Sequence, residues 1–309
     1  MNVPVFIDIS LEEQAEELRA YFKSLGAEIS EERSEKGLED DLHKIIGVCD
    51  ASFKEATESE VEGIMNGIVS MLALCSGDKS ESLILSFCEK LSKAPTTELG
   101  LVCLKVLWSL FQSLEDISSM RYHVYYYLVG LGGKTKQLAT VYTDLATTKN
   151  MFAKSQPALS TEQLQKLYRL LHEVLLASGR SEEAGLVMVE LLGTFTTENA
   201  SQAREEAQRC IIASLADPNT FLFDHLLSLK PVKFLAGELI HDLLNIFVFE
   251  KLEVYTKFYE GHKEFVNGLG LKHEDNTRKM KLLSFMQLAE NRLLETYLST
   301  RININLYFL

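Results

Sequence analysis

The stretch "DPNTFLFDHLLSLKPVKFLAGELIHDLLNIF", residues 217–247, decides the fold. It places two apolar segments with helical spacing on either side of Pro231. A proline lacks an N–H and disfavours helical geometry in the residue before it. The sequence therefore predicts that one helix ends at Pro231 and that a second begins near Ala236.

We expect the side chains around this turn to be structural. Phe234 and Leu239 flank the predicted turn, and Leu243 lies one helical turn after Leu239. Apolar residues at this spacing form the buried face of a helix. The prediction is a turn at Pro231 with Phe234, Leu239 and Leu243 buried where the two helices meet.

A polar stripe runs along the second helix, formed by Glu238, His241, Asp242 and Asn245. Glu-x-x-His is also the spacing found in di-iron helix bundles. Such a site needs a second Glu-x-x-His pair and two more glutamates, and the sequence has no second copy of the pair. We interpret the four residues as a candidate interface stripe, with an enzyme that uses Glu238 and His241 as the alternative.

Other candidate sites in the sequence are equally weak. No family signature surrounds Cys210, which precedes Asp224 and His225, so a core thiol is favoured over a nucleophile. "GLGG" at 130–133 follows a helical pattern and predicts a helix stop, not a phosphate loop. "YHVYYYLV" has no Arg/Lys cluster beside it and predicts a helix core with an interface. The sequence predicts no catalytic residue, no metal site and no cofactor.

Composition limits the classes of partner. The 309 residues are 46% hydrophobic and 24% charged, which is typical of a folded chain, and the net charge is −13. Phosphate binding depends on Lys and Arg, so we expect no strong direct binding of nucleic acid. The chain has five scattered cysteines, no long apolar run and no secretory pattern at its start. These features predict a cytoplasmic protein that does not bind membranes.

Helical periodicity extends through the rest of the chain. Ser10 with Glu13, and Ser160 with Gln163, have the spacing of capping boxes at helix starts. Short polar turns separate the apolar helices, and strand-like alternation is nearly absent. The pattern predicts an all-α, right-handed solenoid of stacked helix pairs without a repeated sequence motif.

From Glu183 the sequence resembles a known family. "EAGLVMVELLGTFTTENASQAREEAQRCIIASLADPNTFLFDHLLSLKPVKFLAGELIHDLLNIFV" and "KFYEGHKEFVNGLGLKHEDNTRKMKLLSFM" are similar to the PCI-domain subunits of eukaryotic translation initiation factor 3. The resemblance runs through most of residues 1–290, and its specificity comes from its length. It implies a helical bundle leading into a winged helix, together called a PCI domain.

The resemblance implies a non-catalytic scaffold subunit of the initiation factor 3 complex. Its partners would be the other subunits, and the small ribosomal subunit through the complex. The alternative within this class is a PCI scaffold subunit of the COP9 signalosome or the proteasome lid. An RNA-binding adaptor is a third hypothesis, which the acid excess disfavours.

The end of the chain departs from the family pattern. After "KLLSFMQLAENR", where a winged helix is expected, the sequence reads "LLETYLSTRININLYFL". We predict three parts: an N-terminal helical repeat region at 1–180, the helical part of the PCI domain at 181–290, and a divergent tail at 291–309. The winged helix is predicted to be largely or wholly missing. We expect the tail to fold back or to stay exposed. We also expect the helix at 280–288 to keep part of its apolar face open.

Overall fold

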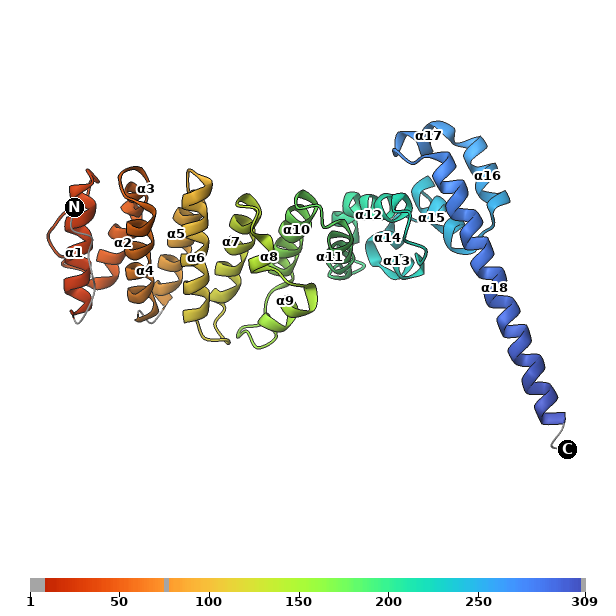
Figure 1. Cartoon of the computed structure of the whole chain (residues 1–309), viewed down its shortest axis with the longest axis horizontal. Coiled ribbons are helices and arrows are strands. Elements are labelled where there is room, and N and C mark those ends of the chain that lie inside the picture. The colour runs from red at the N-terminus through yellow and green to blue at the C-terminus, as the bar shows by residue number, and fades with distance from the viewer. Residues whose placement is uncertain (1–8, 75–77, 307–309) are drawn as a thin grey trace. The chain divides into compact units, whose positions relative to one another are not determined.

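A computed structural model describes the backbone of residues 9–74 and 78–306 (Figure 1). It describes the side chains of these residues except 78, 79 and 290–306. Contacts divide the chain into two compact units, Met1–Ala184 and Gly185–Leu309. The boundary falls inside helix α11 (Ser181–Gly193). The three-part division at 180 and 290 remains a prediction.

Unit 1 consists of helices stacked in two rows. One row follows α1, α4 and α6, and the other follows α2, α5, α7 and α10 (Figure 1). The helices are α1 (Leu11–Ser24), α2 (Leu38–Val48), α3 (Ser52–Glu55), α4 (Glu58–Leu74), α5 (Asp78–Ser92), α6 (Thr97–Ser113), α7 (Met120–Lys134), α8 (Leu138–Val141), α9 (Leu145–Phe152) and α10 (Thr161–Ala177). Within the described ranges, β pairing is limited to one isolated bridge between Ser118 and Gln156. The predicted all-α solenoid is confirmed.

Local capping explains where several of these helices begin. The Ser10 hydroxyl accepts a hydrogen bond from the Glu13 N–H at 3.3 Å, and the Glu13 carboxylate accepts one from the Ser10 N–H at 2.8 Å. Ser160 and Gln163 form the same reciprocal pair at the start of α10. These contacts satisfy N–H groups that have no partner within the helix. Both predicted capping boxes are confirmed.

Loss of the α10 cap should have a small, measurable effect. We expect Ser160→Ala to lower the free energy of unfolding by about 1 kcal/mol, because the Gln163 N–H loses its acceptor. Urea denaturation measures this change. Ser70→Ala, on the exposed face of α4, is the matched control and should stay within about 0.5 kcal/mol of the parent. Equal effects of the two substitutions would contradict the role of the cap.

Glycine lets two helices approach closely at the end of α7. A Cβ placed on Gly133 would lie 2.5 Å from Val174 Cγ1 of α10. Helix α7 continues through Lys134 and ends in a cap at Thr135. The predicted stop at "GLGG" is therefore right to within one residue, but the cap is Thr135 and not a glycine. Gly133 lies inside the last turn because a side chain there would clash with its neighbour.

Unit 2 contains shorter helices packed around an aromatic core. Phe247 makes T-shaped contacts with Phe223 and Tyr255, and all three rings are buried. The helices are α12 (Arg204–Ala216), α13 (Asp224–Ser228), α14 (Lys230–Phe234), α15 (Leu239–Phe249), α16 (Leu252–Gly261), α17 (Lys263–Gly268) and α18 (His273–Leu306). Helix α18 is the longest, yet among the described helices none combines the length and the apolarity of a membrane span.

Candidate functional site

The structure places Pro231 differently from the sequence prediction. Helix α13 ends at Ser228, and Leu229 is extended with ψ 133°. Pro231 then lies in the first turn of α14, where its missing N–H costs no helical hydrogen bond. Gly237, with φ 92°, makes the next turn, and α15 begins at Leu239. The prediction that Pro231 ends a helix, with a restart near Ala236, is therefore wrong.

The three apolar residues that were predicted to be buried, Phe234, Leu239 and Leu243, differ in burial. Leu243 is fully buried, and Leu239 is intermediate. Phe234 is 50% exposed, so the prediction that it lies in the core is wrong. Phe234 is the last residue of the five-residue helix α14, whose buried residues are Pro231 and Val232. A helix this short buries one narrow face, and Phe234 lies outside that face.

Glu238 in the polar stripe is held by side chains of α12. Its carboxylate accepts hydrogen bonds from Arg204 Nε at 3.1 Å, Arg204 Nη2 at 2.8 Å and Gln208 Nε2 at 3.0 Å. A bidentate arginine contact fixes the geometry of both groups. Glu238 therefore links the start of α15 to α12 and is not a free carboxylate.

The other members of the stripe form a separate group. His241 Nδ1 and Asn245 Nδ2 lie 3.0 Å apart, and Asp242 is exposed. Glu238 contacts Arg204 and Gln208, and His241 contacts Asn245. These contacts do not join His241 to the Glu238 carboxylate. The stripe thus presents one exposed carboxylate and one His–Asn pair, and its role as an interface remains a prediction.

Reversing the charge of Glu238 should destabilise unit 2 slightly. We expect Glu238→Lys to lower the free energy of unfolding by about 1 kcal/mol, because the partly exposed pair becomes a repulsion with Arg204. The swap Arg204→Glu with Glu238→Lys should restore most of the loss, as chemical denaturation would show. An unchanged denaturation midpoint for the single variant, or no recovery in the swap, would contradict a stabilising contact between Glu238 and Arg204.

Groups that carry chemistry do not converge in this region. Across the described residues, no three His, Cys, Asp or Glu side chains are grouped to hold a metal ion. Burial raises the pKa of the Cys210 thiol to about 12, so the reactive thiolate is scarce at neutral pH. The arrangement supports a structural role for Cys210.

A buried lysine that no local sequence pattern indicates caps the C-terminal end of α12. Lys279 of α18 is 5% exposed, and its ammonium donates to the carbonyls of Ser214 at 3.0 Å, Leu215 at 2.9 Å and Asp217. It also lies 5.1 Å from the centre of the Phe223 ring. Burial lowers the pKa of Lys279 to about 8, so the ammonium is still mostly protonated at neutral pH. Only the long-range packing of α18 on α12 reveals this contact.

Helix α18 presents an open apolar face beyond this lysine. Leu282, Phe285, Met286 and Leu288 are 43, 70, 48 and 60% exposed. The prediction of an open apolar face on the helix at 280–288 is confirmed. The backbone continues as one helix to Leu306, so residues 291–306 do not turn back. The packing expected of the tail's side chains, and all of residues 307–309, lie outside the described residues.

Comparison with known proteins identifies close relatives. Over 288 residues the chain is 57% identical to eukaryotic translation initiation factor 3 subunit M of Drosophila erecta and of Drosophila melanogaster. The match covers 93% of this chain and 74% of each relative. The Culex quinquefasciatus protein of the same name is 58% identical over 290 residues, with the same coverage. No protein-family model matches the chain.

Proposed function

We propose a role for this chain from one premise: it belongs to the family of eukaryotic translation initiation factor 3 subunit M. That membership makes it a subunit of the initiation factor 3 complex with a role in translation initiation. The observation that carries the proposal is the 57% identity over 93% of the chain. The finer role that we infer is a non-catalytic, cytoplasmic scaffold that supports binding of the small ribosomal subunit through the complex.

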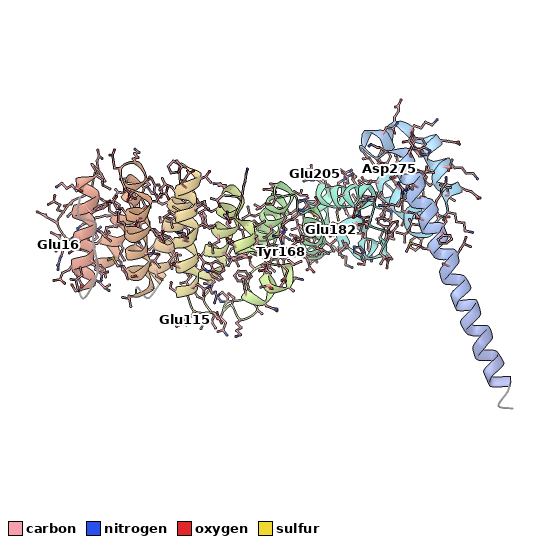
Figure 2. The ribbon with its side chains drawn as sticks, in the orientation of Figure 1. Glu16, Glu115, Tyr168, Glu182, Glu205 and Asp275 are labelled. Atoms are coloured by element: carbon pink, nitrogen blue, oxygen red, sulfur yellow. The ribbon has the colours of Figure 1, made fainter. Side chains whose placement is uncertain are left out.

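The surface of the chain supports a role in binding proteins. Acidic side chains are exposed on both units, among them Glu16, Glu205 and Asp275 (Figure 2). A net charge of −13 disfavours direct contact with RNA phosphates. In contrast, four large apolar side chains are open on α18. Clustered apolar exposure is typical of protein interfaces, so we assign contact with other subunits to this face.

Affinity purification tests the complex to which the chain belongs. A tagged copy expressed in cells of a eukaryote should recover the subunits of initiation factor 3 in stoichiometric amounts, together with the small ribosomal subunit. Ribonuclease treatment should leave the subunits bound, since the contacts are between proteins. Recovery of COP9 signalosome or proteasome lid subunits, without initiation factor subunits, would overturn the proposal.

Polar substitutions on α18 should separate folding from assembly. We expect Phe285→Ser with Leu288→Ser to change the free energy of unfolding by less than about 0.5 kcal/mol, since both side chains are exposed. Recovery of initiation factor subunits should fall severalfold, as a quantitative pull-down would measure. Lys281→Ser, also exposed on α18, is the matched control and should assemble normally. Full recovery by the double variant would remove α18 from the interface.

A further inference from the structure

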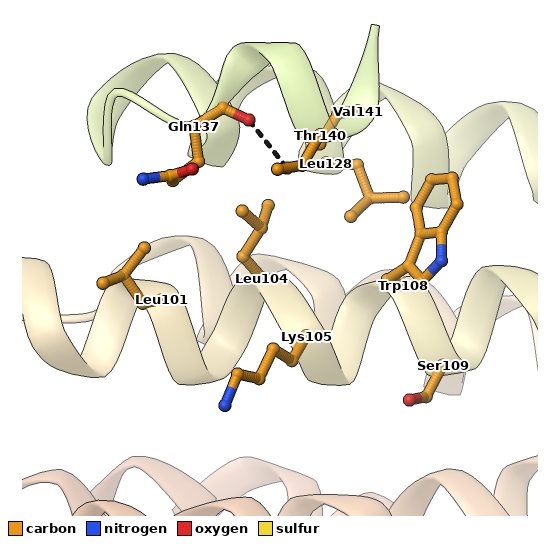
Figure 3. A pocket seen from close by; sticks show the side chains of 9 residues that line it. All are labelled: Leu101, Leu104, Lys105, Trp108, Ser109, Leu128, Gln137, Thr140 and Val141. Atoms are coloured by element: carbon orange, nitrogen blue, oxygen red, sulfur yellow. Dashed lines mark hydrogen bonds between the residues drawn. The ribbon is translucent and has the colours of Figure 1, made fainter.

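We draw no further inference here: the strongest candidate, the apolar pocket between α6 and the α7–α8 segment of unit 1 (Figure 3), carries none, because the ammonium of Lys105 in its lining is already paired with Glu62 and nothing in the structure shows what occupies the pocket.

Discussion

Replacing Lys279 with methionine should lower the free energy of unfolding by roughly 3–5 kcal/mol. The ammonium donates to the carbonyls of Ser214, Leu215 and Asp217 at the end of α12. The last carbonyls of a helix have no partner within the helix, and a cation at this end is also favoured by the helix dipole. Methionine fills the same space but leaves these acceptors without their donor.

The loss should be localised to unit 2. Hydrogen exchange should show that amides of α12 and of the start of α18 lose protection, while amides of unit 1 keep it, and urea denaturation gives the change in stability. Lys281→Met, on the exposed side of α18, is the matched control and should change stability by less than about 0.5 kcal/mol. Equal denaturation midpoints for Lys279→Met and the parent would show that water replaces the ammonium without cost.

Helices were predictable because their signals are local. The Ser160–Gln163 capping box spans three residues, and apolar spacing reveals the buried face of α10 directly. The stacking of pairs follows, because each amphipathic helix must cover its apolar side. The fold class could be inferred from such patterns, whereas the family rests on the resemblance of long stretches such as residues 183–248.

Errors and omissions arose where distant residues decide the outcome. Gly133 has the sequence of a helix stop, but Val174 of α10 requires a glycine inside the helix. Glu238 is restrained by Arg204, 34 residues away, and Lys279 by Asp217, 62 residues away. Phe234 is apolar by composition, yet α14 is too short to bury it. Local patterns contain no information about these partners.

The pocket of about 500 Å³ beside α6, with Leu104 and Trp108 in its lining, illustrates the same limit (Figure 3). Its apolar face was visible in the sequence, where Leu104 and Trp108 belong to one helical pattern. The pattern alone predicts that a neighbouring helix covers this face. The structure shows instead that α8 spans only Leu138–Val141 and leaves part of the face open. Sequence periodicity identifies a face that needs a partner, but not whether the partner lies in the same chain.

A buried ion pair in unit 1 should give a second large effect. Arg19 of α1 is 1% exposed, and its Nη1 lies 2.8 Å from Asp41 Oδ1 of α2. The contact is close without the alignment of a hydrogen bond, and Arg19 Nη2 has no hydrogen-bond partner among the described residues. Asp41 therefore supplies a negative charge beside the buried guanidinium of Arg19.

Removing one partner should cost more than removing both. We expect Asp41→Leu to lower the free energy of unfolding by roughly 3–5 kcal/mol, because Arg19 stays buried without its counter-charge. Arg19→Met should cost less, since Asp41 still accepts a hydrogen bond from the Ser34 N–H at 2.9 Å. The double variant should be more stable than Asp41→Leu alone, because the desolvation cost of both charges disappears.

Urea denaturation of the three variants and the parent forms a complete double-mutant cycle. The quantity of interest is the coupling free energy between the two positions. A double variant whose loss equals the sum of the two single losses would show that the ion pair contributes through packing alone. Recovery in the double variant would show instead that α1 and α2 are held together mainly by their apolar faces, where Leu18, Phe22 and Ile45 are fully buried. The charges then fix the register of the two helices at the start of the solenoid without adding to its net stability.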